Sequence, residues 1–133
     1  MPATSKVHFS GRNLYRVTYH FDFAGADDET DVIKLNISTL TGPDGVNAPS
    51  SVRVDELDWS VQGTGLQAVQ IEFDDGTDER IAVVSGDSYR DYRPDGGFTV
   101  DALTGTGDIV FTTLGTVAAG DSYDITMRLR LKE

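Results

Sequence analysis

Two acidic segments carry side chains of the kind that bind Ca²⁺. Their acidic residues are Asp27, Asp28, Glu29 and Asp31 in the first segment and Asp74, Asp75, Asp78 and Glu79 in the second. A calcium ion takes about six to eight oxygen ligands, and neither segment has the alternating spacing and final bidentate Glu of an EF-hand. Solvated turns are therefore the default interpretation, and we predict no metal and no cofactor. A meeting of the two acidic segments in space would favour a calcium site.

Residues for catalysis are few. His8 and His20 are the only imidazoles and cysteine is absent, which leaves few ligands for zinc. No serine lies in a Gly-x-Ser-x-Gly motif, and neither histidine lies in a sequence typical of a catalytic triad. Paired carboxylates for glycoside hydrolysis stay open, because any acidic β protein contains them. We predict no catalytic residue and no enzyme activity.

The most unusual segment runs from Ser88 to Gly97. Tyr89, Arg90, Tyr92 and Arg93 lie close together there in a chain with few basic residues, and Tyr and Arg are enriched in interface hot spots. The segment is our candidate partner-contact loop. In the alternative, the tyrosines pack on the end of the domain and nearby aspartates neutralise the arginines. Stacking of single-stranded nucleic acid is disfavoured by the negative charge of the chain.

Three further features have simple structural interpretations. Trp59 could stack on a sugar, but it is in phase with Leu57 and Val61, which favours the core. The segments Gly63-Thr-Gly65 and Gly105-Thr-Gly-Asp108 lack the lysine and the following helix of a phosphate loop. They are expected to form tight turns in which glycine supplies a positive φ.

The last third of the chain sets the fold class. Ile109, Phe111 and Thr113 alternate with other residues, and Tyr123 to Leu131 repeats this pattern for nine residues. Strict alternation of this kind predicts strands with one buried face. We expect the two runs to form a β-hairpin and the second run to be a central strand.

Other segments also read as strands. Strands are predicted over 14–23, over 32–39 with Ile33, Leu35 and Ile37 inward, and over 51–62 with a β-bulge at Asp55-Glu56 or a corner between two short strands. Residues 66–85 predict a β-hairpin. Residues 40–51 predict no regular element, residues 86–97 are polar, aromatic and rich in Pro and Gly without a predicted strand, and residues 98–103 predict a short strand. About eight or nine strands without a helical period indicate an all-β antiparallel sandwich or jelly-roll-like domain over 7–133, after a flexible arm of residues 1–6.

Composition limits the partners. The chain of 133 residues has 22 acidic and 11 basic residues, a formal net charge of −11 and no cysteine. Its charge predicts repulsion from nucleic acid and anionic membranes, and no apolar run is long enough to span a bilayer. We expect a soluble single domain without disulfides that binds neither nucleic acid nor membrane.

The tail of the chain contains four distinctive segments: Gly96-Gly97, Thr106-Gly-Asp-Ile-Val-Phe-Thr-Thr113, Gly120-Asp-Ser-Tyr-Asp-Ile-Thr126 and the basic Arg128 to Lys132. In these segments the chain resembles small virion structural proteins of tailed bacteriophages. Upstream, Val54-Asp-Glu-Leu-Asp-Trp59 and the 66–85 hairpin are also similar, so the resemblance covers about residues 52–133. It implies a virion role in capsid decoration or cement, and no catalytic residue is carried over with it.

The function expected from the resemblance is a non-enzymatic protein that binds the phage head surface and reinforces it. Its partners would be the major capsid protein or another virion protein and further copies of itself, with a trimer as the favoured number. It would be assembled in the host cytoplasm and located in the virion. The alternatives are a neck or tail structural protein and a β-sandwich module that binds carbohydrate or Ca²⁺.

Overall fold

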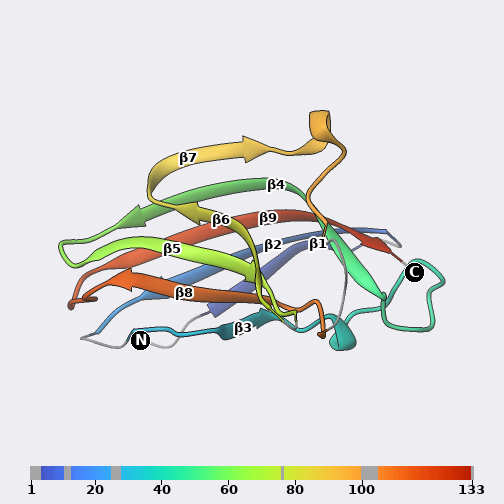
Figure 1. Ribbon diagram of the computed structural model, residues 1–133, viewed down its shortest axis with the longest axis horizontal. Coiled ribbons are helices and arrows are strands. Elements are labelled where there is room, and N and C mark those ends of the chain that lie inside the picture. Colours follow the sequence, from blue (N-terminus) through green and yellow to red (C-terminus); the bar gives the residue numbers. More distant parts are fainter. Residues whose placement is uncertain (1–3, 11–12, 25–27, 76, 100–104, 133) are drawn as a thin grey trace.

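The protein is an antiparallel β-sandwich. The computed structural model describes residues 4–10, 13–24, 28–75, 77–99 and 105–132. Within these ranges nine strands form two sheets, and every strand pair is antiparallel. Figure 1 shows the two sheets as layers, with the strands of the four-stranded sheet in front of those of the five-stranded sheet. The all-β sandwich predicted from the alternation is confirmed.

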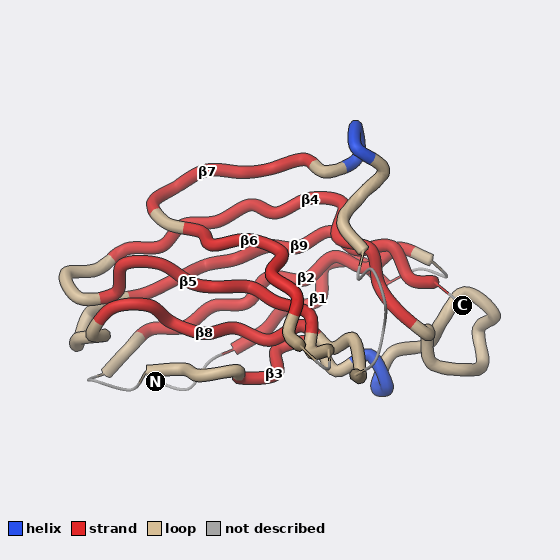
Figure 2. The backbone as a smooth tube through the Cα atoms, viewed as in Figure 1, coloured by secondary structure: helices blue, strands red, loops and turns tan. Residues whose placement is uncertain are grey.

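Each sheet combines strands from distant parts of the chain. The five-stranded sheet consists, in spatial order, of β1 (Thr4–Ser10), β2 (Leu14–Asp22), β9 (Ser122–Lys132), β4 (Ser51–Gln62) and β7 (Gly86–Asp91). The four-stranded sheet consists of β3 (Val32–Leu35), β8 (Ile109–Gly115), β5 (Leu66–Phe73) and β6 (Glu79–Val84). Two single 3₁₀ turns, η1 (Ile37–Thr39) and η2 (Arg93–Asp95), lie in the loops, which Figure 2 separates from the strands by colour. None of the helices in the described ranges has the length and apolar character of a membrane span.

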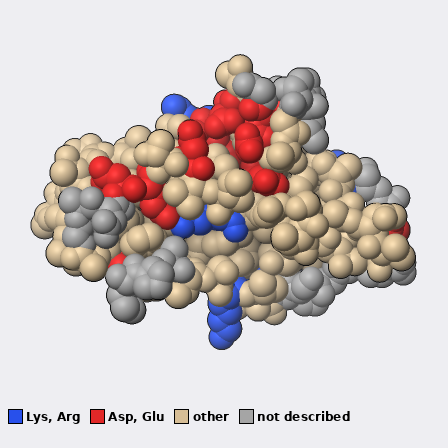
Figure 3. All heavy atoms as spheres, turned by 90° about the horizontal axis from the view of Figure 1, so that it is seen from below, with Lys and Arg blue, Asp and Glu red and all other residues tan. Residues whose placement is uncertain are grey.

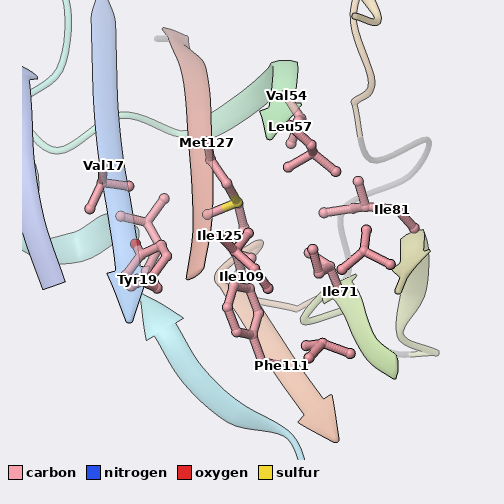
Figure 4. Packing of buried hydrophobic residues seen from close by; sticks show 14 of the residues in the cluster. Val17, Tyr19, Val54, Leu57, Ile71, Ile81, Ile109, Phe111, Ile125 and Met127 are labelled. Atoms are coloured by element: carbon pink, nitrogen blue, oxygen red, sulfur yellow. The ribbon is translucent and has the colours of Figure 1, made fainter. Parts of the chain in front are cut away.

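The core fills the space between the two sheets. On β9, Tyr123, Ile125, Met127 and Leu129 are fully buried, and their faces meet those of β8 and β5 across the sandwich. Figure 4 shows side chains of the two sheets pointing toward one another, among them Ile125 and Met127 of β9 and Ile71 and Phe111 of the other sheet. Because β9 lies between β2 and β4, the prediction of a central strand is confirmed.

Two local predictions are also confirmed. The register between β4 and β9 shifts between Val54 and Glu56, so a bulge at Asp55 keeps β4 one continuous strand. β5 and β6 pair as the hairpin expected over 66–85.

The predicted hairpin of the last two strands is wrong. β8 pairs with β3 and β5, whereas β9 pairs with β2 and β4 in the other sheet. Alternation gives each strand a buried face but does not identify its neighbour. The connection over 116–121 therefore crosses from one sheet to the other, with Val117 and Asp121 buried in it.

Three segment predictions differ from the structure. The segment 86–97 contains β7, which alternation missed because its side chains are polar and exposed on both faces. β3 ends at Leu35, and Ile33, predicted inward, is 52% exposed because β3 is an edge strand. β1 begins at Thr4, inside the predicted arm of residues 1–6, because its backbone pairs with β2. Of the strand predicted over 98–103, Phe98 bridges Val54 and residues 100–103 lie outside the described ranges.

Candidate interaction surface

The Tyr89–Arg93 segment begins in an edge strand. β7 pairs with β4 on one side, from Glu56 opposite Asp91 to Val61 opposite Gly86. Every residue of β7 before Asp91 is exposed, and Tyr89 is 73% exposed. Such an edge presents unpaired backbone groups, which a second chain can pair with.

The four candidate contact residues divide into two groups. Tyr92 is buried, its hydroxyl donates to the Ile81 carbonyl oxygen at 3.3 Å, and Arg90 lies over its ring. Arg93 pairs with Asp91 and with Glu56, at 3.0 and 2.9 Å, and its hydrogen bonds hold the pKa of Asp91 below its usual range. Tyr92 and Arg93 are therefore structural, as the alternative interpretation expected, and Tyr89 is the exposed candidate for contact.

Arginines form cross-strand pairs at one end of the outer face of the five-stranded sheet. Arg16 on β2 lies directly opposite Arg128 on β9, and Arg53 on β4 lies opposite Arg130. Hollows of about 270 and 160 Å³ share Arg16 and Arg128 in their linings. The sequence showed these arginines on polar strand faces but could not show that the strands are neighbours.

The other end of the same face carries a clamped histidine. Asp124 lies against Nδ1 of His20, and Nε2 lies 2.9 Å from a carboxylate oxygen of Asp22. These hydrogen bonds, first to Asp22 and then to Asp124, raise the pKa of His20 above its ordinary value of 6.5. The imidazole is therefore occupied by two carboxylates on the protein surface.

The His20 clamp predicts a small pH dependence of stability. Because folding raises the pKa of His20, the clamp stabilises the fold fully below about pH 6.5, and this contribution is lost as the pH rises through the folded pKa. With the imidazole 40% exposed, we expect the contribution to be only a few tenths of a kcal/mol. NMR titration of His20 should give a pKa above 6.5 that falls in Asp22→Asn and in Asp124→Asn. An unchanged pKa in both variants would contradict this assignment.

A buried ion pair joins the two sheets. Lys34 Nζ lies 2.5 Å from Glu29 Oε2, and their side chains are 7% and 6% exposed. Tyr123 donates its hydroxyl proton to Glu29 Oε1 at 2.6 Å, and the rings of Phe21, Phe111 and Tyr123 lie 5.6 to 5.9 Å from Nζ. Burial, together with the Glu29 carboxylate, keeps the pKa of Tyr123 far above its usual range, so the hydroxyl stays a donor. Glu29, weighed as a calcium ligand in the sequence, instead has a structural partner.

The two acidic segments do meet. Oxygens of Asp31, Glu72 and Asp78 lie within 4.8 Å of one another, and Figure 3 shows acidic side chains gathered on the face seen from below. Other carboxylates of these loops accept local hydrogen bonds: Asp28 from the Val117 amide at 3.2 Å and Asp74 from the Thr106 hydroxyl at 3.0 Å. Asp27 lies outside the described residues. Three carboxylates supply only part of the six to eight oxygens, roughly, that calcium takes.

The aspartates of the two Gly-Asp segments at 107–108 and 120–121 have structural roles. Asp108 accepts from the Ile37 amide at 2.9 Å, and Asp121 accepts from the amides of Thr64, Gly65, Leu66 and Ala118. Both carboxylates are buried. The glycines of the 63–65 turn do not have the positive φ expected of them. A Cβ at Gly63 would lie 2.3 Å from Asp121 and one at Gly65 would lie 1.7 Å from the Thr116 oxygen, so close approach requires glycine.

Trp59 is partly buried against the core cluster. Its indole N–H donates to the Ser85 carbonyl oxygen at 3.0 Å, next to the turn into β7. Trp59 was expected in the core, but its ring is only partly buried. Its hydrogen bond to Ser85 anchors the edge strand to β4.

The described surface thus offers an exposed edge strand beside a charged sheet face. Such a surface suits contact with another protein, because an edge strand can pair with a second chain and because Tyr and Arg are enriched at interfaces. No family model matches the chain, and no curated protein is significantly similar to it.

Proposed function

We propose that this chain is a non-enzymatic structural protein of a bacteriophage virion, a capsid decoration protein that assembles as a homo-oligomer on the head. Its partners are further copies of the chain and the major capsid protein. The observation that carries the proposal is the exposed strand β7, with Tyr89 at 73% exposure, beside the charged outer face of the five-stranded sheet. The resemblance over about residues 52–133 supports the virion setting, and its motifs contain the buried loop aspartates Asp108 and Asp121.

The solution mass tests this proposal. We expect light scattering on the purified chain to give a discrete oligomer, because a protein that binds a symmetric lattice commonly assembles with closed symmetry. Addition of purified empty heads should then carry the oligomer into the pellet on sedimentation. A monomer at all concentrations that also fails to sediment with heads would contradict the proposal.

A calcium-binding module is the second candidate, favoured by the meeting of Asp31, Glu72 and Asp78. If calcium binds there, millimolar CaCl₂ raises the melting temperature, because a ligand of the folded state stabilises it. The shift should disappear in Asp78→Asn and persist in Asp87→Asn, a matched change on the exposed strand β7. If the chain is an oligomer whose mass and melting temperature do not change with calcium, the result supports the virion protein instead.

A further inference from the structure

Among the described residues, the Arg16–Arg128 pair lacks a full set of counter-charges. Like charges directly opposite on neighbouring strands repel. The neighbouring pair, Arg53 and Arg130, is bridged by the buried carboxylate of Asp55, which lies 2.7 and 3.9 Å from the two Nε atoms. In the part of the chain that the structure describes, no carboxylate forms ion pairs with both Arg16 and Arg128 as Asp55 does with Arg53 and Arg130.

Glu56 forms an ion pair with Arg128 and shares its carboxylate with Arg93, and Asp58 lines the smaller hollow beside the two arginines. Glu56 Oε1 lies 2.9 Å from Arg93 and 3.6 Å from Arg128. Arg16 forms no ion pair in the described ranges and is exposed. Beside it lies the hollow of about 270 Å³ lined by Leu14, Tyr15, Arg16 and Arg128. Two guanidinium groups therefore face solvent with an adjacent space that a carboxylate side chain can enter.

An opposite excess of charge lies on the other sheet. Asp31, Glu72 and Asp78 bring their oxygens together at the start of β3, on β5 and before β6. No Lys or Arg in the described part of the chain forms an ion pair with them. The arginine pair lies on the outer face of the five-stranded sheet, so the two clusters cannot meet within one copy.

We propose that Arg16 and Arg128 dock against the Asp31, Glu72 and Asp78 cluster of a second copy of this chain. The inference rests on the homo-oligomer of the proposed function and assigns its interface. A second copy supplies three carboxylates gathered within 4.8 Å of one another, which matches the two guanidinium groups locally. Arg forms bidentate hydrogen-bonded pairs with carboxylates, and this geometry makes the contact specific in orientation as well as attractive.

The contact joins different patches on the two copies, so the assembly is head to tail. Such a contact closes into a ring when the rotation between copies allows it. Because the contact is polar and exposed at its rim, we expect it to weaken as salt screens the charges.

Charge reversal with exchange tests the interface. The first variant is Arg16→Glu with Arg128→Glu, and the second is Glu72→Lys with Asp78→Lys. We expect light scattering to show at least a tenfold weaker association for each variant alone, because each then presents two like-charged patches. Mixing the two variants should restore assembly, since each supplies the charge that the other has lost. Lys6→Glu, a reversal on β1 of the same sheet, is the matched control and should assemble as the original chain does.

The outcomes separate this interface from the proposed function. Circular dichroism and melting curves first establish that both variants fold. If the original chain assembles and both folded variants assemble equally well, the proposed interface is wrong, whereas the homo-oligomer of the proposed function is unaffected. Variants that stay apart on mixing also overturn it. An original chain that is monomeric at every concentration overturns the homo-oligomer itself.

Discussion

Replacement of Glu29 by leucine is expected to lower the free energy of unfolding by about 3–5 kcal/mol, because it leaves the ammonium group of Lys34 buried without its partner. The two side chains are 6% and 7% exposed, so water cannot solvate the charge that remains. The Tyr123 hydroxyl loses its acceptor in the same variant. Urea unfolding monitored by Tyr and Trp fluorescence measures the change.

The triple variant Glu29→Leu, Lys34→Met, Tyr123→Phe distinguishes the pair from simple loss of packing. Replacing a whole buried ionic group by apolar residues of similar volume is often neutral or stabilising, so most of the lost stability should return. The exposed pair of Glu56 with Arg93 gives the control, and Glu56→Gln should cost less than about 1 kcal/mol. A triple variant as unstable as Glu29→Leu would show that the charges contribute net stability to the fold.

The sequence predicted strands well where each buried a single face. On β9, five alternating apolar residues meet the opposite sheet, and each is 3% exposed or less. The same reasoning located the bulge at Asp55, because two apolar phases in one strand require an extra residue. Alternation shows which side of a strand is apolar, and the fold buries that side.

Strand partners and edges were harder to predict. β8 and β9 look like a hairpin in the sequence, yet they belong to opposite sheets, because alternation is identical for either pairing. β7 has no buried face that alternation could reveal. Ile33 belongs to an alternating run but lies on an edge strand with no sheet to cover it. These features depend on the position of a strand in the sheet and not on its own residues.

The candidate site depended on contacts between distant residues. Tyr89, Arg90, Tyr92 and Arg93 lie close together in the sequence as the candidate contact residues, but only the structure separates the buried Tyr92 from the exposed Tyr89. The Arg16–Arg128 pair joins residues of β2 and β9, which are adjacent only because β9 enters the sheet between β2 and β4. The sequence predicted the polar faces, and the topology determined which charges became neighbours.

Replacement of Asp121 by asparagine is expected to lower the melting temperature at pH 7 by on the order of 10 °C, because the carboxylate accepts hydrogen bonds from four backbone amides. These amides belong to the β4–β5 turn and to the β8–β9 connection, at 2.8 to 3.2 Å. Asparagine keeps one acceptor oxygen and turns its amide hydrogens toward the remaining donors. Calorimetry gives the melting temperature, and Asp124→Asn on the exposed face is the control that should change it little.

The pH dependence of the Asp121→Asn effect tests its cause. Hydrogen bonds from Ala118 and then from the β4–β5 turn hold the pKa of Asp121 below its usual 3.8. A lowered pKa means that the carboxylate stabilises the fold above about pH 3.8 and that this contribution is lost as the pH falls through the folded pKa. The difference in melting temperature between the original chain and Asp121→Asn should therefore be large at pH 7 and shrink in strong acid. A difference that stays constant with pH would mean that the shape of the side chain, and not its charge, holds the two loops together. These loops join the ends of β4, β5, β8 and β9, which belong to both sheets. By holding the two loops together, the Asp121 side chain supports the topology that brings Arg16 beside Arg128.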